Sequence, residues 1–300
     1  MKSKTNLVKD AARILSKNKF RIKDVHGNPG GLIDLQKDKR SVLIVGDLHG
    51  SVENLKAVVE HEDNKENLKK GKSVLVLVGD AFHNDQTGQM KEMESSAYVL
   101  EEIIRLINIY RDNLIFIRGN HDTFDENLVK SGIRQGLEFK NYLLKTKKSL
   151  YVKAVEQMLK CLPYCIVGDN YVITHAGPVR NGASRREIIN IADNPDYARQ
   201  LMWNRLNEFR GTPNMKEYSE YDIQKMLIKL NMPEDSYFIV GHNPLWNTGN
   251  HSGIWSHVMG IRNHYIIYSN IGTPSPYLKI NKGKLEEKYG SEITKEVMYV

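Results

Sequence analysis

The stretch VLIVGDLHG at residues 42–50 decides the fold of this 300-residue chain. Its first four residues are apolar and mostly β-branched, which predicts a strand that is buried on both faces. Strands of that kind occur in α/β proteins, where helices cover both sides of a sheet. Asp47 and His49 follow directly, and both residue types bind metal ions. The stretch therefore predicts a buried strand that presents metal-binding side chains at its carboxyl end.

Four further segments repeat this arrangement along the chain. Each is a short apolar run followed by a polar motif with a coordinating residue: GD at 79–80 after VLVLV, GNHD at 119–122 after LIFI, HAG at 175–177 after VIT, and GH at 241–242 after YFIV. In open α/β sheets, ligands bind in the crevice outside the carboxyl ends of the strands. The five motifs are therefore expected to meet in one place.

Together the motifs supply carboxylate, amide and imidazole side chains, namely Asp47, His49, Asp80, Asn120, His175 and His242. This is the ligand set of two adjacent divalent metals in a hydrolytic site. A glycine directly precedes four of these residues, where the missing Cβ permits a sharp turn and a close approach. A single Gly-Asp pair or a lone His is an ordinary turn or core feature, but five motifs after five apolar runs are not.

The order of the motifs resembles the calcineurin-like metallophosphoesterase superfamily, whose members carry Asp-x-His, Gly-Asp, Gly-Asn-His-Asp or Glu, a later His and a final Gly-His. The resemblance covers roughly residues 41–272. Gly50 after the first motif, the single His of GHNP at 241–244 and YIIYSN at 265–270 are most similar to the phosphoprotein phosphatase branch, which also holds dinucleoside tetraphosphatases. The resemblance implies an α/β fold with a central β-sandwich of mixed sheets flanked by helices.

The same resemblance assigns a role to each metal-binding residue. It implies that Asp47 and His49 bind one metal, that Asn120, His175 and His242 bind the other, and that Asp80 bridges the two. Three imidazoles with oxygen ligands suit manganese first, with iron or zinc as alternatives, better than magnesium or calcium. Two such ions about 3.5 to 4 Å apart hold a water between them and lower its pKa toward neutrality.

The resemblance also implies that His121 protonates the leaving group as general acid. Phosphoprotein phosphatases continue their second motif as Gly-Asp-x-x-Asp-Arg-Gly, in which the second Asp pairs with this His and the Arg holds phosphate. Here the motif reads GDAFHND, so His83 and Asn84 stand at those two places. Asp85, one residue further on, and Asp122 are the two alternatives for the partner of His121.

Three arginines are candidates for the phosphate contact that the missing Arg would have made. Arg118 precedes GNHD, Arg180 follows HAGP, and Arg205 lies in LMWNR, which is similar to a Leu-Trp segment of the family. For each of them, a solvated or structural charge is an equally good interpretation.

Composition favours a cytoplasmic enzyme without a membrane partner. The chain is 40% hydrophobic but has no run of about 20 apolar residues, and its N-terminus lacks the apolar core of a signal peptide. The two cysteines, Cys161 and Cys165, have no second pair with which to form a metal knuckle, so we expect buried thiols. The net charge of +7 gives mild support to an anionic substrate, but nucleic-acid binding is not favoured because the lysine clusters are mixed with acidic residues.

The chain is expected to form one catalytic domain over residues 1–300, with 1–31 as an N-terminal helical extension and 124–160 as a helical insertion or cap. Helices are predicted over 4–18, 53–68 and 91–111, an edge strand over 32–36, and hairpins at 165–174 and around 281–283. The segment 245–264 carries Trp246, Trp255 and three histidines. It is either a loop over the metal crevice or a set of core tryptophans and surface histidines.

Four functions remain open from the sequence. The leading one is a metal-dependent phosphomonoesterase that acts on a phosphorylated protein or peptide at phosphoserine, phosphothreonine or phosphotyrosine. The nearest alternative is a hydrolase of dinucleoside polyphosphates or another phosphorylated small molecule. A phosphodiesterase or nuclease is disfavoured by the single His of GHNP. A catalytically idle phospho-binding scaffold is disfavoured because it would not need six intact ligands.

Overall fold

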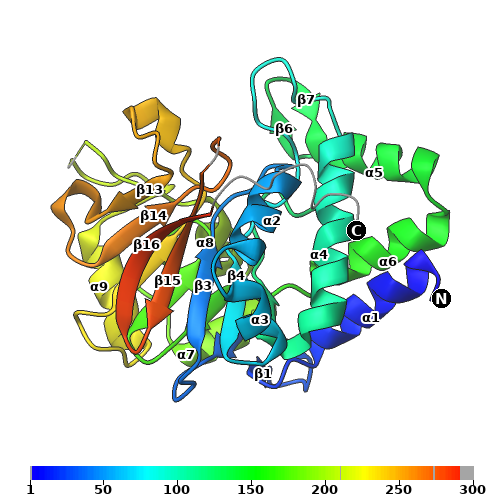
Figure 1. Cartoon of the computed structure of the whole chain (residues 1–300). Coiled ribbons are helices and arrows are strands. Elements are labelled where there is room, and N and C mark those ends of the chain that lie inside the picture. The colour runs from blue at the N-terminus through cyan, green and yellow to red at the C-terminus, as the bar shows by residue number, and fades with distance from the viewer. Residues whose placement is uncertain (1, 210, 273, 291–300) are drawn as a thin grey trace.

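Two mixed β-sheets pack face to face in the computed structural model, and helices cover both outer faces (Figure 1). The structure describes residues 2–209, 211–272 and 274–290, with residues 246 and 247 described by their backbone only. The predicted α/β fold with a central sandwich of mixed sheets is confirmed.

Within the described residues, the smaller sheet has five strands in the order β16, β15, β3, β4 and β5 (Lys284–Gly290, Ser275–Asn281, Ser41–Val45, Ser73–Leu77 and Leu114–Phe116). β3 pairs in parallel with β4, and β4 pairs in parallel with β5. Their carboxyl ends therefore lie at the same edge, and these are the ends that carry the first three polar motifs.

The larger sheet has seven strands in the described part of the chain, in the order β1, β2, β8, β9, β12, β14 and β13 (Arg21–Lys23, Pro29–Asp34, Cys165–Val167, Tyr171–Thr174, Tyr237–Val240, His264–Ile267 and Ile254–Ser256). β12 is parallel to both β9 and β14. The motifs of His175 and His242 consequently end at one edge of this sheet.

Alternating side chains of the central strands enter two different cores. Val42 and Ile44 of β3 pack between the sheets, whereas Leu43 and Val45 pack against the helices on the outer face. A strand buried on both faces has no polar position, which explains the continuous apolar run in the sequence.

The outer face of the smaller sheet is covered by helices from the first half of the chain, which share one apolar core: α1, α2, α3, α4, α5 and α6 (Lys4–Ser16, Val52–Glu60, Asn64–Lys69, Glu94–Tyr110, Gln135–Thr146 and Ser149–Lys160). α1 packs against α4 and α6, so the N-terminal helix and the last helix of 124–160 belong to this layer. The role of 124–160 as a cap stays a prediction.

The larger sheet is covered by α7, α8 and α9 (Arg185–Ile189, Pro195–Trp203 and Glu220–Lys229), which share a second core. The remaining elements are the hairpin β6 and β7 (Val129–Lys130 and Ile133–Arg134), the parallel pair β10 and β11 (Arg205–Leu206 and Glu217–Tyr218) and the 3-10 turns η1 to η4 (Arg111–Asn113, Ile191–Asp193, Leu245–Thr248 and Val258–Gly260).

Two sequence predictions of elements are wrong. The helix expected over 53–68 is divided into α2 and α3, because the backbone of Glu62 takes a left-handed φ of 47° between them. The strand expected at an edge over 32–36 is β2, which lies inside the sheet between β1 and β8. The glycines of β2 interrupt the apolar pattern by which a buried strand is predicted. Glycine is needed at residue 31 because a Cβ there would lie 2.4 Å from the carbonyl oxygen of Ile188.

The predicted hairpins at 165–174 and around 281–283 are confirmed as β8 with β9 and β15 with β16.

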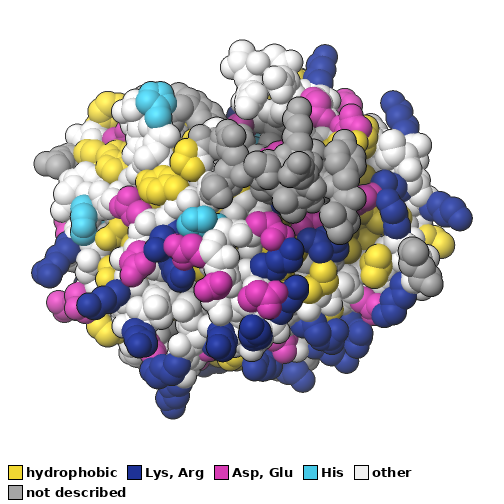
Figure 2. Space-filling view, in the orientation of Figure 1, with side chains coloured by type: hydrophobic (Ala, Val, Ile, Leu, Met, Phe, Trp, Pro, Cys, Tyr) yellow, Lys and Arg dark blue, Asp and Glu magenta, His cyan; other side chains and the backbone are white. Residues whose placement is uncertain are grey.

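None of the helices in the described part of the chain combines the length and apolar character that a membrane crossing needs. On the face shown in Figure 2, Lys and Arg side chains are spread along the lower edge and are mixed with Asp and Glu. The excess positive charge is therefore dispersed on this face.

Candidate metal centre

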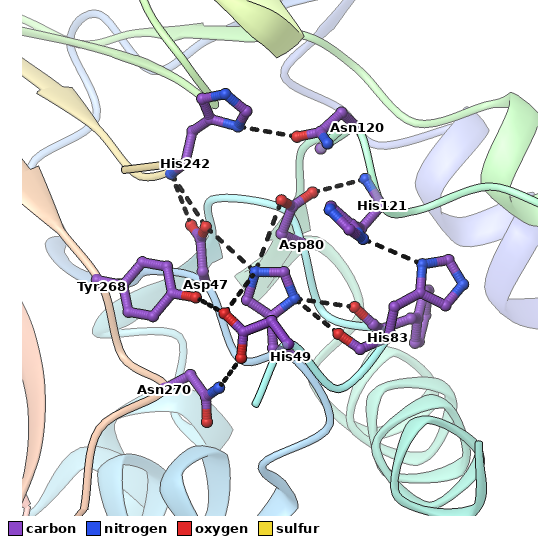
Figure 3. A network of polar contacts seen from close by, with 12 residues as sticks. Asp47, His49, Asp80, His83, Asn120, His121, His242, Tyr268 and Asn270 are labelled. Atoms are coloured by element: carbon purple, nitrogen blue, oxygen red, sulfur yellow. Dashed lines mark hydrogen bonds and ion pairs between the residues drawn. The ribbon is translucent and has the colours of Figure 1, made fainter. Parts of the chain in front are cut away.

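All six predicted ligands come together where the carboxyl ends of β3, β4, β5, β9 and β12 meet, and all are buried. Figure 3 shows five of them, namely Asp47, His49, Asp80, Asn120 and His242. Two compact groups offer ligand atoms within 4.8 Å of one another, namely Asp80 with His175 and His242, and Asp47 with His49 and Asp80. Asp80 belongs to both groups. Asn120 contacts the first group through its amide.

Backbone N–H groups hold two of the carboxylates in place at this point, one from the same sheet and one from the opposite sheet. The backbone N–H of His121 donates to Asp80 Oδ1 at 2.8 Å, and that of His242 donates to Asp47 Oδ1 at 2.9 Å. A Cβ on Gly119 or Gly241 would lie 2.2 Å from one of these carboxylate oxygens, so glycine is required there. The carboxylates are thus fixed before any ligand binds.

In the first group, nitrogen and oxygen atoms that can only accept hydrogen bonds face one another. His175 Nδ1 lies 2.9 Å from the carbonyl oxygen of Val78, so it carries the proton. In the neutral ring its Nε2 is then an acceptor, yet it faces Asn120 Oδ1 at 3.0 Å and Asp80 Oδ2 at 3.3 Å. His242 Nδ1 lies 2.9 Å from the same amide oxygen. A cation placed between these atoms would satisfy all of them at once.

The orientation of the Asn120 amide tests this interpretation. If the amide were rotated, its NH2 group would donate to Asp80, His175, His242 and the carbonyl oxygen of Met202. The rotated amide satisfies a metal-free site, whereas the oxygen-inward amide suits a site that holds a metal. The donor set therefore fits a metal ion, and the choice between the two orientations depends on that ion.

The second group has the same character around His49. His49 Nδ1 lies 2.9 Å and 3.2 Å from the carbonyl oxygens of His83 and Phe82, so this nitrogen also carries a proton. His49 Nε2 points toward carboxylate oxygens of Asp47 at 3.8 Å and Asp80 at 3.9 Å. These distances exceed a hydrogen bond and leave room for an ion between the atoms.

Without metals, the candidate metal centre has an excess of negative charge, as the pKa values of Asp47 and His175 indicate. Burial, reinforced by the nearby Asp80 carboxylate, raises the pKa of Asp47 to about 7. Burial opposes charge on His175, but the attraction of Asp80 outweighs it and raises the pKa of His175 to about 9. Both shifts indicate that the site binds positive charge, as a proton or as a metal ion.

His121 lies beside the ligands, and its partner is His83. The two Nδ1 atoms are 3.3 Å apart, and the ring of His121 also makes an edge contact with His49 at 5.0 Å between centroids. His83 is buried, and burial together with the charge of His49 lowers its pKa to about 3, so it is neutral. A neutral imidazole therefore occupies the position where the family has a carboxylate.

The two aspartates proposed as alternatives for that position are engaged elsewhere. Asp85 accepts hydrogen bonds from the Tyr268 hydroxyl and, at 2.8 Å, from the Asn270 amide. Asp122 accepts backbone N–H groups of Gly119, Asp80 and Ala81 at 2.8 to 3.0 Å. The expected pairing of His121 with Asp85 or Asp122 is therefore wrong. In the structure, His121 contacts His83 instead. Asp122 instead fixes the turns that present the ligands.

The three candidate arginines lie in different surroundings. Arg205 donates to the side chain of Asn243 at 3.0 Å, directly beside the ligand His242. Arg180 donates to the carbonyl oxygen of Asn214, and Arg118 is 3.5 Å from the Tyr164 hydroxyl. Arg205 is the one that the structure connects to the metal centre through a neighbouring residue, and its role toward phosphate stays a prediction.

The segment 245–264 contributes core residues. Trp255 is half-buried and packs against the outer core of the larger sheet. His251 and His257 are exposed, whereas His264 is buried and contacts Tyr218 and the carbonyl oxygen of Phe238, so the expected surface position is wrong for His264. The side chain of Trp246 lies outside the described residues.

Sequence reasoning missed the contact between His83 and His121 and the contacts of Asp85 with Tyr268 and Asn270. One signal was available, because His83 stands at the family's Asp position and YIIYSN contains Tyr268 and Asn270. These residue positions do not show that Asp85, on the smaller sheet, contacts Tyr268 and Asn270, on the larger one.

A two-sheet sandwich with convergent carboxylate, amide and imidazole acceptors at its strand ends defines the metallophosphoesterase class of hydrolases. A family model of the calcineurin-like phosphoesterases matches residues 40–269. The chain belongs to this family and is a hydrolase. The family depends on a dinuclear metal centre, and the candidate ligands for one are present.

Solved structures of phosphatases share the fold. A protein serine/threonine phosphatase from Saccharomyces cerevisiae, with similarity to human phosphatase PP5, is 13% identical, with 97% of this chain and 90% of that chain covered and a TM-score of 0.69. A cold-active protein-tyrosine phosphatase from a psychrophilic Shewanella species is 14% identical over 87% and 82%, with a TM-score of 0.52. These likenesses show the fold alone. Among proteins of curated function, no significant match is found.

Proposed function

We propose that the protein is a metal-dependent phosphomonoesterase and that its substrates are phosphorylated proteins or peptides. The observation that carries this proposal is the convergence of acceptor atoms from Asp80, Asn120, His175 and His242, which a cation between them would satisfy. Asp47, His49 and Asp80 would hold one ion, and Asp80 with Asn120, His175 and His242 the other. When bound, two such ions supply an activated water and neutralise phosphate charge. Manganese is our first choice, with iron or zinc as alternatives.

The chain's own residues position the acid. Asp80 accepts the backbone N–H of His121 at 2.8 Å, so a ligand and the acid are held as one unit. If the shared proton lies on Nδ1 of the neutral His83, His121 accepts it at Nδ1 and carries its own proton on Nε2. That tautomer directs a donor toward the leaving-group oxygen. Burial keeps the pKa of His121 well below its usual range, so the donor is a neutral imidazole.

One observation favours nucleotide substrates as a second candidate function. Trp203 is 43% exposed, and its ring makes an edge contact with that of the ligand His242 at 6.2 Å between centroids. An exposed indole beside the metal centre offers a stacking surface for a nucleobase. Hydrolysis of dinucleoside polyphosphates is the corresponding activity. Phosphodiesterase activity is less favoured because GHNP carries a single His, and binding without catalysis is less favoured because the candidate ligands and His121 are intact.

The deciding experiment compares three substrate types with manganese-loaded protein. Hydrolysis of p-nitrophenyl phosphate much faster than of its bis ester is expected for a monoesterase, and the reverse order would replace it by a diesterase. Phosphopeptides against diadenosine tetraphosphate then decide between a phosphomonoesterase and a hydrolase of phosphoric anhydrides. Trp203→Ala is expected to spare phosphopeptide hydrolysis, and selective loss of tetraphosphate hydrolysis would assign the nucleotide function.

Three further assignments belong to this proposal. Cys161 and Cys165 are both free thiols, which supports a reducing, cytoplasmic environment. Residues 1–300 are proposed to form one catalytic domain, with Arg205 as the first candidate for a phosphate contact. Its guanidinium would reach substrate from beside Asn243.

A further inference from the structure

Asp85 is a buried carboxylate whose charge has no obvious compensation. Its side chain is 1% exposed, and it accepts hydrogen bonds only from the neutral groups of Tyr268 and Asn270 among the described residues. In that part of the chain, the one basic side chain within ion-pair distance is His49, with Nε2 at 3.8 Å from Asp85 Oδ2. A buried charge requires a counter-charge. The counter-charge for Asp85 therefore lies on the His49 side.

His49 Nε2 faces three carboxylates at nearly equal distances, 3.8 Å for Asp47, 3.9 Å for Asp80 and 3.8 Å for Asp85. Its Nδ1 is occupied by backbone carbonyl oxygens, so a neutral His49 presents a lone pair to all three. Two of these carboxylates form a compact ligand group with His49, and Asp85 does not belong to it. Asp85 is thus placed just outside that group.

The position of Asp85 is fixed from the opposite sheet. Asp85 follows β4 of the smaller sheet, whereas Tyr268 and Asn270 follow β14 of the larger one. Figure 3 shows Tyr268 and Asn270 pointing into the same polar network as His49. Each donor holds one carboxylate oxygen, so the side chain cannot turn away without losing a bond. This bridge also closes the seam between the sheets beside the metal position.

We propose that Asp85 is an outer carboxylate of the metal position formed by Asp47, His49 and Asp80, and that Tyr268 and Asn270 hold it there. This inference rests on the proposed dinuclear site. Asp85 strengthens binding at this position through its charge and through a water molecule or ligand on the metal, while the position of His175 and His242 is little affected. It is a positioning residue for the metal and does not act on His121.

The test measures Mn²⁺ binding to the metal-free full-length protein by titration calorimetry. Asp85→Asn keeps the shape of the side chain and can still bond to Tyr268 and Asn270. We expect it to weaken one of two Mn²⁺ sites about 10- to 100-fold and to change the other less than about threefold. Tyr268→Phe keeps the carboxylate but removes one donor, so a smaller loss at the same site is expected. Equal Mn²⁺ affinities in wild type and Asp85→Asn would overturn the proposal.

Matched controls separate metal binding from folding. Asp222→Asn changes a buried carboxylate at the start of α9, and Tyr277→Phe removes a buried hydroxyl that contacts His61 and Asn64. Neither is expected to change Mn²⁺ affinity. Without metal, Asp85→Asn should keep or raise the melting temperature, since it removes a charge beside Asp47 and Asp80. An equal fall with and without metal would mean a structural bridge only, and failure of the wild type to bind two Mn²⁺ ions would refute the proposed function instead.

Discussion

The buried histidines His175 and His264 have similar surroundings at one nitrogen and opposite surroundings at the other. Each places Nδ1 at 2.9 Å from a backbone carbonyl oxygen, of Val78 or of Phe238. His264 Nε2 then accepts a hydrogen bond from the Tyr218 hydroxyl at 3.0 Å, whereas His175 Nε2 faces two oxygen acceptors. Burial and a backbone bond do not distinguish a ligand from a core histidine. The partner of the second nitrogen does.

The comparison has an electrostatic counterpart. Burial lowers the pKa of His264 to about 4, because Tyr218 and the backbone offer no charge. For His175 the carboxylate of Asp80 outweighs burial, and the pKa rises to about 9. The protein thus completes one histidine with its own groups and leaves the other to be completed by a proton or a metal ion.

Asp80→Asn should have the largest effect, because Asp80 belongs to both ligand groups and also holds the backbone of His121. We expect loss of both metals and a fall in turnover of at least about a thousandfold. Metal content measured on the purified protein, together with phosphatase assays, checks this. Asp222→Asn serves as the control. Full metal occupancy in Asp80→Asn would contradict the prediction, since the metals would then be held without the carboxylate that the two groups share.

His121→Asn should come next, with turnover reduced about 10²- to 10⁴-fold while both metals remain bound. The reason is that His121 contacts His83 and the backbone of Asp80 but belongs to neither compact ligand group of the described residues. Turnover and metal stoichiometry are measured on the same preparation. Retained full activity would remove His121 from the mechanism, and lost metal would make it a ligand.

The convergence of the six candidate ligands could be predicted from the sequence, because the place of each residue depends on local pattern and one topological rule. An apolar run such as residues 74–78 predicts a strand, and parallel strands bring residues such as Asp80 and Asn120 to one edge. The partners of the polar groups could not be predicted in this way. Which side chain meets His121 depends on the left-handed turn at His83, with φ 67°, and no sequence pattern specifies it.

The contacts between the two sheets could not be predicted from the sequence for a related reason. Asp85 meets Tyr268, which is 183 residues away in the chain, only because the two sheets close face to face. The motif GNHD suggested a catalytic role for Asp122, but its geometry satisfies backbone donors of two turns. A motif identifies which residues are special and leaves open whether they serve chemistry or structure.

Asp122→Ala tests whether Asp122 serves structure or chemistry. Like His264, Asp122 has hydrogen-bond partners within the protein. Three buried backbone N–H groups would lose their acceptor, which should lower the free energy of unfolding by about 3 kcal/mol. Urea denaturation of the metal-free protein measures this, with His121→Asn as the comparison variant. A stable Asp122→Ala protein with impaired turnover would return Asp122 to the catalytic residues.

The smallest expected effect is the pH dependence contributed by His264. Its pKa is lowered from 6.5 to about 4 by burial, so the unfolded chain binds this proton at higher pH than the folded protein. The resulting stability is complete above pH 6.5 and is lost as the pH falls toward 4. Between pH 7 and pH 5 the loss amounts to about 2 kcal/mol. The difference in unfolding free energy between wild type and His264→Gln should shrink by that amount. A constant difference would show that folding does not shift the pKa of His264, and a difference that grows as the pH falls would show that His264 is charged in the fold like His175.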